Sequence, residues 1–313
     1  AYIPASALGP VVSCRSELHE DYGHLSELAR AAVRATVLRL DLKACDLNPV
    51  AAGAFLQAVV DATTTTTSPS PASPAACLQR ISLAANPIFG DNGSAGDSNL
   101  RDCELFFSAL KAAITVRSMC FDETGMGKDA AGRLVASLPT TIRSISALNN
   151  PLGTVGVQSL AHYLLGVNLE LRTLCGLEDG QTRVDWRCSA KGPSDMALLA
   201  ADLDAAAMDR PAAARTLRDV ALDGCVSVTG TSFIAGAAAA GSPEGDVAEL
   251  DADMSGWEPF CRALPASAVV RVSLRSCYVG QAAVALLAEA AGVPAELLRQ
   301  QAVARNLVVV MQK

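Results

Sequence analysis

The residue types that most often carry catalysis or hold metals are sparse in this chain of 313 residues. Its three histidines are His19, His24 and His162, and their spacing does not place any of them beside a nucleophile. The motifs GxSxG, HExxH and GxxxxGKS, which mark acyl transfer, zinc hydrolysis and phosphate binding, do not occur. We therefore expect a protein that is not an enzyme and that has no catalytic residue, no cofactor and no metal ligand.

The chain has ten cysteines, but no CxxC pair. Their spacing is not that of a small secreted domain held together by disulfides. We expect reduced thiols and an intracellular, cytoplasmic protein. Location in an organelle is the alternative, because a removed presequence leaves no trace in the sequence.

Charge and hydropathy bear on the kind of partner. The formal net charge is −7, and Lys and Arg do not cluster into a run, so we expect no nucleic-acid partner. Residues 244–253 hold five carboxylates, which we interpret as a solvated surface. The longest apolar stretches are shorter than the roughly 20 residues of a membrane span, so we expect none.

One spacing recurs along the chain and indicates how the elements are organised. In LQRISLAANPI, residues 78–88, apolar residues fall at offsets 0, 3, 5 and 10, and Asn86 falls at offset 8. Clear copies begin at residues 37, 78, 116, 142, 217 and 269, and weaker ones begin at residues 171 and 247. Each copy precedes an Ala/Leu-rich stretch of helical periodicity, so one unit is a short strand, a turn and a helix.

This LxxLxLxxN/C pattern resembles that of leucine-rich repeat proteins, and the long helix-bearing units resemble their ribonuclease-inhibitor-like class. The resemblance covers about residues 37–291 and departs from the family at Thr124, where Asn or Cys is usual. It implies an α/β leucine-rich-repeat solenoid, a horseshoe with parallel strands on the concave side and helices on the convex side.

The repeats define the expected domain organisation. Residues 1–36 form an N-terminal helical cap, residues 37–291 form about eight repeats, and residues 292–313 form a C-terminal cap helix and strand. We expect the strand at 307–311 to run parallel to the last repeat. Insertions are expected at residues 63–74, 89–99 and 177–193, and the last two should share one rim of the horseshoe.

The residue at offset 8 turns the chain away from each strand. A buried Asn amide there can pair with backbone groups that the turn leaves without partners, and a Cys thiol is a weaker donor at the same place. We therefore expect structural roles and burial at Cys45, Asn86, Thr124, Asn150, Cys225 and Cys277, with unreactive thiols at the cysteines.

We expect such repeats to bind other proteins, as an interaction module or a subunit of a larger assembly. Trp186, flanked by Arg183 and Arg187, is the leading candidate anchor on the rim, because Trp and Arg dominate binding hot spots. An equal alternative is that Val184, Trp186 and Cys188 alternate inward and pack over the core. Outward positions on the concave face add Asp41, Lys43, Asp122, Glu123 and Asp223, and their carboxylates favour a partner with basic groups.

An arginine also occurs near the start of nearly every predicted strand, and we interpret this row as solvated rather than as a binding stripe. It comprises Arg39, Arg80, Arg117, Arg143, Arg172, Arg218 and Arg271. The alternative function is a GTPase-activating regulator resembling the Ran GTPase-activating proteins, although the long acidic tail of that family is missing from this sequence. A GTP-hydrolysis assay with candidate GTPases distinguishes the two functions.

Overall fold

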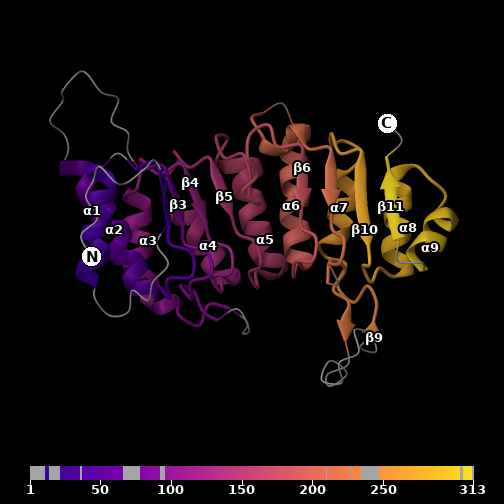
Figure 1. Ribbon diagram of the computed structural model, residues 1–313, viewed down its shortest axis with the longest axis horizontal. Coiled ribbons are helices and arrows are strands. Elements are labelled where there is room, and N and C mark those ends of the chain that lie inside the picture. The colour runs from indigo at the N-terminus through magenta and orange to yellow at the C-terminus, as the bar shows by residue number, and fades with distance from the viewer. Residues whose placement is uncertain are drawn as a thin grey trace. The chain divides into compact units, whose positions relative to one another are not determined.

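The chain divides into two compact units, Ala1–Leu171 and Arg172–Lys313, which we call unit 1 and unit 2. The computed structural model describes residues 11–13, 22–35, 37–65, 78–91, 96–208, 210–225, 227–233, 247–303 and 306–311. Figure 1 shows the strands and helices of both units. Each unit is described separately below.

Unit 1 is built on a sheet of short parallel strands in the order β1-β2-β3-β4-β5. The strands align Leu40 with Ile81, Ile81 with Met119 and Met119 with Ile145, and all four side chains are buried. Because side chains alternate along a strand, the flanking residues point away from the core. The strands are β1 Val11–Ser13, β2 Arg39–Asp41, β3 Arg80–Ser82, β4 Ser118–Cys120 and β5 Ser144–Ser146.

Helices follow the strands of unit 1, and consecutive helices lie side by side (Figure 1). They bury the apolar side chains that the repeat template places inward, together with a cluster of phenylalanines around Phe89 and Phe106, whose ring centroids are 5.7 Å apart. The helices are α1 Tyr22–Arg34, α2 Pro49–Thr65, the 3₁₀ turn η2 Leu100–Cys103, α3 Glu104–Ala112, α4 Lys128–Ser137, α5 Gly153–His162 and the π-helical turn η3 Tyr163–Val167.

Unit 2 has a sheet in the order β11-β10-β7-β6 and a separate two-stranded sheet, β8-β9. Strands β6, β7 and β10 are parallel to one another, and Val184, Val220 and Val272 align as buried neighbours. Strand β11 is antiparallel to β10, and β8 is antiparallel to β9. The strands are β6 Arg183–Asp185, β7 Asp219–Ala221, β8 Ser232–Phe233, β9 Val247–Glu249, β10 Arg271–Arg275 and β11 Asn306–Val310.

The helices of unit 2 also pack in chain order, α6 on α7, α7 on α8 and α8 on α9. Trp257, at the start of α7, is fully buried and donates its indole N–H to the Ala283 carbonyl on α8 at 3.0 Å. The helices are α6 Pro193–Ala207, the 3₁₀ turn η4 Ala213–Thr216, α7 Trp257–Ala263, α8 Gln281–Ala291 and α9 Ala295–Val303.

The turning residues of the repeats are buried, as expected from the template. The Asn86 Oδ1 atom accepts hydrogen bonds from the backbone N–H groups of Cys45 and Leu47 in the preceding repeat, at 3.0 and 2.9 Å. Its Nδ2 group donates to three backbone carbonyls, those of Leu42, Leu83 and Ala84. Asn86 therefore ties two successive repeats together through groups that the turn leaves open.

Two weaker copies of the template do not form repeat strands. The segment that begins at Leu171 is held instead by Asp202 of α6, whose carboxylate accepts the backbone N–H of Leu174 at 2.7 Å and the Thr173 hydroxyl at 2.5 Å. Gly176 has a positive φ of 69° where the template needs an extended residue. The copy at Val247 is also wrong, since β9 pairs antiparallel with β8 and Leu250 is 46% exposed.

The segment 177–193 differs from the insertion that we expected, because it contains β6, a repeat strand that pairs in parallel with β7. In the other expected rim insertion, 89–99, Phe89 is fully buried. Asp97 accepts the N–H groups of Gly127, Asp129 and Ala130 at the start of α4. For the insertion at 63–74, α2 continues to Thr65 and the remainder lies outside the described residues.

Both terminal regions correct the expected organisation. Residues 1–36 contain α1 but also β1, which pairs in parallel with β2. At the other end the expected cap helix and strand are present, but the parallel direction expected for 307–311 is wrong. Helix α9 follows α8 and reverses the direction of the chain once more before β11 begins. A strand that follows a single helix would enter the sheet at one end, and β11 therefore enters it at the other end.

Candidate functional site

The outward-facing side chains of β6, β7 and β10 form a regular array of charges in unit 2. At the start of these strands Arg183, Asp219 and Arg271 are aligned across the sheet. Four residues further on the alignment continues through Arg187, Asp223 and Arg275, because the Cys188 N–H bonds to the Asp223 carbonyl and the Gly224 N–H bonds to the Arg275 carbonyl. In both rows an aspartate of β7 or the turn after it lies between two arginines.

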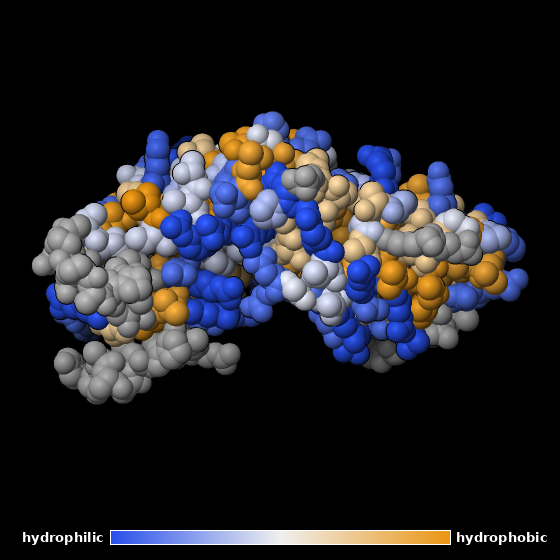
Figure 2. Space-filling model, turned by 90° about the horizontal axis from the view of Figure 1, so that it is seen from above, coloured by the Kyte–Doolittle hydropathy of each residue, from blue (hydrophilic) through white to orange (hydrophobic). Residues whose placement is uncertain are grey.

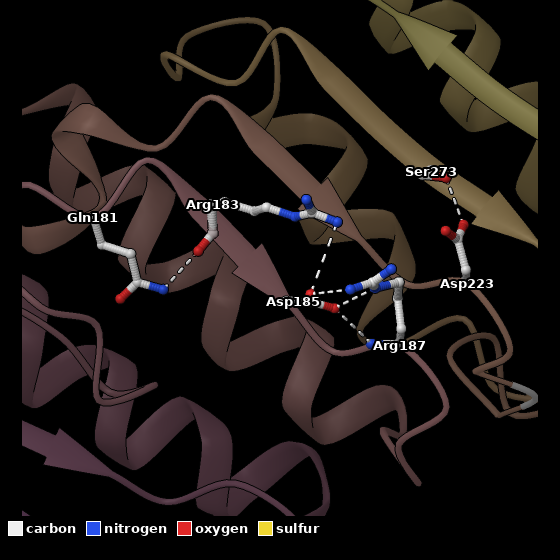
Figure 3. Close-up of polar contacts among 6 residues, drawn as sticks. All are labelled: Gln181, Arg183, Asp185, Arg187, Asp223 and Ser273. Atoms are coloured by element: carbon white, nitrogen blue, oxygen red, sulfur yellow. Dashed lines mark hydrogen bonds and ion pairs between the residues drawn. The ribbon is translucent and has the colours of Figure 1, made fainter.

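A recess of about 410 Å³ opens at the carboxyl ends of these three strands. Helices pack behind the strands, and the side chains drawn in Figure 3 lie on the opposite side. The recess combines two cations, two carboxylates and an exposed thiol. Its lining residues are Asp185, Arg187, Cys188, Asp223, Gly224, Arg275 and Ser276.

Asp185 and Arg187 form a bidentate ion pair on one side of the recess (Figure 3). The Arg187 Nε and Nη2 atoms lie 2.7 and 2.6 Å from the two carboxylate oxygens, and Arg183 Nη2 is 3.8 Å from Oδ2. The hydrogen bonds from Arg187 lower the pKa of Asp185 to about 2, and Asp185 raises the pKa of Arg187. Gln181 donates to the Arg183 carbonyl at 2.7 Å.

Asp223 is held by the neighbouring strand. Its Oδ1 atom accepts the Ser273 hydroxyl at 2.5 Å and the Arg275 backbone N–H at 2.8 Å (Figure 3). The same arrangement occurs in unit 1, where Asp122 accepts the Ser146 hydroxyl and the Leu148 N–H at 2.6 and 2.8 Å. Both aspartates thus fasten one repeat to the next, which weakens the expectation that they attract a basic partner.

Trp186 lies at the template position of the core residue Leu222, since its N–H bonds to the Ala221 carbonyl. The side chain is partly buried, and the buried Lys191 places its ammonium group 5.4 Å from the centre of the indole ring. Val184 beside it is buried and Cys188 is exposed. The register favours packing for Trp186, and its role as a binding anchor stays a prediction.

The other sequence-predicted site residues belong to unit 1. Asp41 and Lys43 lie on and just after β2, and the Lys43 N–H donates to the Asp41 carboxylate at 3.1 Å. Glu123 has a positive φ of 58° in the turn after β4 and accepts the Asn149 side-chain amide at 3.0 Å. Asp122 and Glu123 are thus engaged by the next repeat, whereas Lys43 is exposed.

Sequence reasoning missed Asp185, Asp219 and Arg275 as members of the array, and it interpreted Arg271 as solvated. The missed strand β6 fits the template from Gln181, but the polar Gln181 and Ser189 occupy the positions usually taken by an apolar residue and by Asn or Cys. The 46-residue interval between the copies at 171 and 217 was the available signal, because it leaves room for an additional strand.

Among the described residues, no group of three or more His, Cys, Asp or Glu side chains is arranged to hold a metal ion. In the same residues, no helix combines the length and apolar character that crossing a membrane requires. Figure 2 shows hydrophilic and hydrophobic residues mixed over the face that it views.

Comparisons with known proteins give one named structural likeness. No protein-family profile matches the chain, and no match was found among curated proteins. A matching solved structure is the leucine-rich repeat-containing protein LegL7 from Legionella pneumophila, which is 11% identical. The match covers 90% of each chain with a TM-score of 0.32, and at that TM-score it carries no argument about fold or function.

Proposed function

We propose that this chain is a leucine-rich-repeat interaction module without catalytic activity, which binds a protein partner through the outward face of β6, β7 and β10. The observation that carries the proposal is the charge array of unit 2. Arg183, Asp185, Arg187, Arg271 and Arg275 are exposed on the strand side, while helices bury the other side. Charges arranged on an exposed face give specificity and fast association.

The side chains in the middle of the array are small, which allows a partner to approach the strands closely. Ala221 and Ser273 lie between the two charged rows and are 5% and 6% exposed. A partner surface placed over them contacts the surrounding arginines and aspartates rather than a bulky apolar patch. This arrangement is typical of a polar, specific interface rather than of a core left open.

A steric block tests the proposal independently of the sign of the partner's charge. Asp219→Trp places an indole between Arg183 and Arg271 on the strand side. Glu258→Trp is the matched control, since it makes the same chemical change at an exposed position of α7. We expect a partner captured by the wild type to be lost from Asp219→Trp and retained by Glu258→Trp, with both variants folded by circular dichroism.

Identical capture by both variants argues against the strand side as the interface. Trp186→Ala extends the test to the predicted anchor, where truncation of a hot-spot Trp costs about 2 kcal/mol or more of binding free energy. If Trp186→Ala unfolds unit 2 instead, the indole belongs to the packing of the repeat. For the absence of catalysis, a GTP-hydrolysis assay with candidate GTPases is the direct check.

A further inference from the structure

We propose that the outward face of β10 and β11 binds an extended peptide that carries two carboxylates four residues apart, with an apolar residue midway between them. This inference rests on the proposed function and specifies the chemistry of the partner. It differs from the basic partner expected from the sequence, because Asp185 and Asp223 are already engaged by neighbouring residues, whereas the two arginines of β10 are exposed.

The two arginines of β10 are the open charges of the array. Arg271 and Arg275 are exposed, and neither guanidinium has an ion-pair partner among the described residues. By contrast, Asp185 is bound by Arg187 through both oxygens, and Asp223 accepts hydrogen bonds from Ser273 and from the backbone of Arg275. An incoming carboxylate therefore finds donors on β10, whereas an incoming cation finds Asp185 and Asp223 already engaged.

The spacing of these arginines matches an extended chain. Arg271 and Arg275 are four residues apart on one strand, so they point to the same side and their Cα atoms are separated by about 13 Å. An extended peptide lying along β10 presents side chains to one side at the same interval. Carboxylates at positions i and i+4 of such a peptide can each meet one guanidinium fork.

An apolar strip runs beside the two arginines. Val310 of β11 lies opposite Arg271, and Val308 lies opposite Ser273. The Val310 side chain is 64% exposed, whereas Leu307 and Val309 of the same strand are buried in the core. An apolar residue at position i+2 of the peptide can cover this strip while the carboxylates at positions i and i+4 contact Arg271 and Arg275.

A peptide fits this face better than a nucleic acid. Asp185, Asp219 and Asp223 lie within a few strands of the two arginines and repel a continuous row of phosphates. The net charge of −7 also opposes long-range attraction of a polyanion. Two carboxylates, each held by one guanidinium group, add less negative charge beside Asp219 and Asp223 than a continuous row of phosphates does.

Fluorescence anisotropy with short labelled peptides tests the proposal on the full chain. The probe contains Glu-Ser-Val-Ser-Glu, and the comparison peptides contain Gln-Ser-Val-Ser-Gln, Lys-Ser-Val-Ser-Lys and the rearranged Glu-Glu-Val-Ser-Ser. We expect the probe to bind at least about tenfold more tightly than each comparison peptide, because each hydrogen bond to a charged group is worth about one order of magnitude in affinity. Its affinity should fall as salt is added.

Arginine variants locate the bound peptide. Arg271→Ala and Arg275→Ala should each weaken binding of the probe by about tenfold. Arg262→Ala is the matched control, because Arg262 is exposed on α7 and pairs with Glu258 at 2.8 Å. The control should bind like the wild type. Circular dichroism establishes that the three variants are folded.

Several results overturn the proposal. These are tighter binding of the lysine peptide, equal binding of the rearranged peptide, no binding of any peptide, and full binding by both β10 variants. Tighter binding of a single-stranded oligonucleotide that competes with the probe also rejects a peptide as the partner. If these results occur while Asp219→Trp still abolishes partner capture, the proposed function stands and the acidic peptide is rejected.

Discussion

In unit 1 the turns after β3 and β5 are fastened by Asn86 and Asn150, whereas in unit 2 the turns after β7 and β10 are fastened by Cys225 and Cys277. The Asn150 Oδ1 atom accepts the N–H groups of Thr124 and Met126, and its Nδ2 group donates to Phe121 and two carbonyls of its own repeat. The Cys225 and Cys277 thiols donate to the carbonyls of Trp186 and Leu222, at 2.8 and 3.0 Å.

The difference shows which part of the asparagine's role a thiol can supply. Trp186 and Leu222 occupy the same template position as Leu42 and Phe121, so the cysteine replaces the single bond to the preceding repeat's carbonyl. A thiol does not also receive the N–H groups of that repeat. In unit 2 the Cys225 N–H instead closes a short turn onto the Leu222 carbonyl. The asparagine turn thus depends on its side chain more than the cysteine turn does.

The largest effect is expected from Asn86→Leu in unit 1. Leucine offers no partner to the buried N–H and carbonyl groups that Asn86 binds, and each unsatisfied group costs about 1 to 3 kcal/mol. We expect the free energy of unfolding to fall by at least about 3 kcal/mol in a denaturant titration. Hydrogen exchange should accelerate in β2 and β3. A loss no larger than that of Cys277→Leu would contradict the comparison.

The buried Asp202 predicts a pH dependence that is specific to unit 2. Burial raises the pKa of Asp202 from 3.8 to about 6, although its hydrogen bonds with Thr173, Leu174 and Cys175 oppose the shift. At pH values between 3.8 and about 6, Asp202 retains a proton in the folded state that it has released in the unfolded state. The contribution of Asp202 to stability therefore increases as pH falls from about 7 to 4, by up to about 3 kcal/mol.

Asp202→Asn should remove this contribution while keeping an acceptor for the Leu174 N–H. Denaturant titrations at several pH values between 4 and 7 provide the measurement, with Glu289→Gln at an exposed position of α8 as the control. Parallel pH profiles for the wild type and Asp202→Asn would show that Asp202 does not bind its proton more tightly in the folded state.

Each unit contains a helix whose first N–H groups are capped by an aspartate from outside the helix. Removing this cap should lower the free energy of unfolding by the same amount in both units. Asp97 caps α4 from the preceding repeat, and Asp251 caps α8 by accepting the N–H groups of Gly280 and Ala283 at 2.8 and 3.0 Å. Asp97→Ala and Asp251→Ala should each reduce the free energy of unfolding by about 1 to 2 kcal/mol. Asp97→Asn should restore part of the loss. An effect confined to one unit would break the equivalence.

The smallest effects are expected at the cysteine turns. Cys277→Ser keeps a donor for the Leu222 carbonyl and should change stability by about 1 kcal/mol or less. Burial raises the pKa of Cys277 to about 12 and also raises that of Cys225, so both thiols should resist labelling in the native protein. Among the cysteines in the described residues, mass spectrometry should find Cys188, which is exposed, labelled first. Rapid labelling of Cys277 would show that the turn opens readily.

Each of the six clear copies of the template predicted a strand. The copies at Val37, Leu78, Val116, Ile142, Leu217 and Val269 correspond to β2, β3, β4, β5, β7 and β10. The prediction failed where a side chain outside the motif decides the local structure. Asp202 lies 28 residues beyond Leu174 and replaces a strand partner there, and no local pattern indicates this contact.

The candidate site was predictable in its residue types but not in its arrangement. Arg183, Arg187 and Asp223 do come together in unit 2, whereas the partners of Asp223 depend on the register between β7 and β10. That register brings Ser273 beside Asp223 from 50 residues away. The direction of β11 was equally hidden, because it depends on how α9 packs on α8.

The asparagine bonds also determine how unit 1 should respond to a mechanical load. Asn86 joins the repeats of β2 and β3, and Asn150 joins those of β4 and β5. Between β3 and β4 the turning residue is Thr124, whose hydroxyl donates to the Phe121 carbonyl of its own repeat. Across that boundary the side-chain bonds come instead from Asp97, which caps α4. Pulled along the stack, the Asp97→Ala variant should therefore rupture first between β3 and β4, and each asparagine-joined pair of repeats should be released as one step.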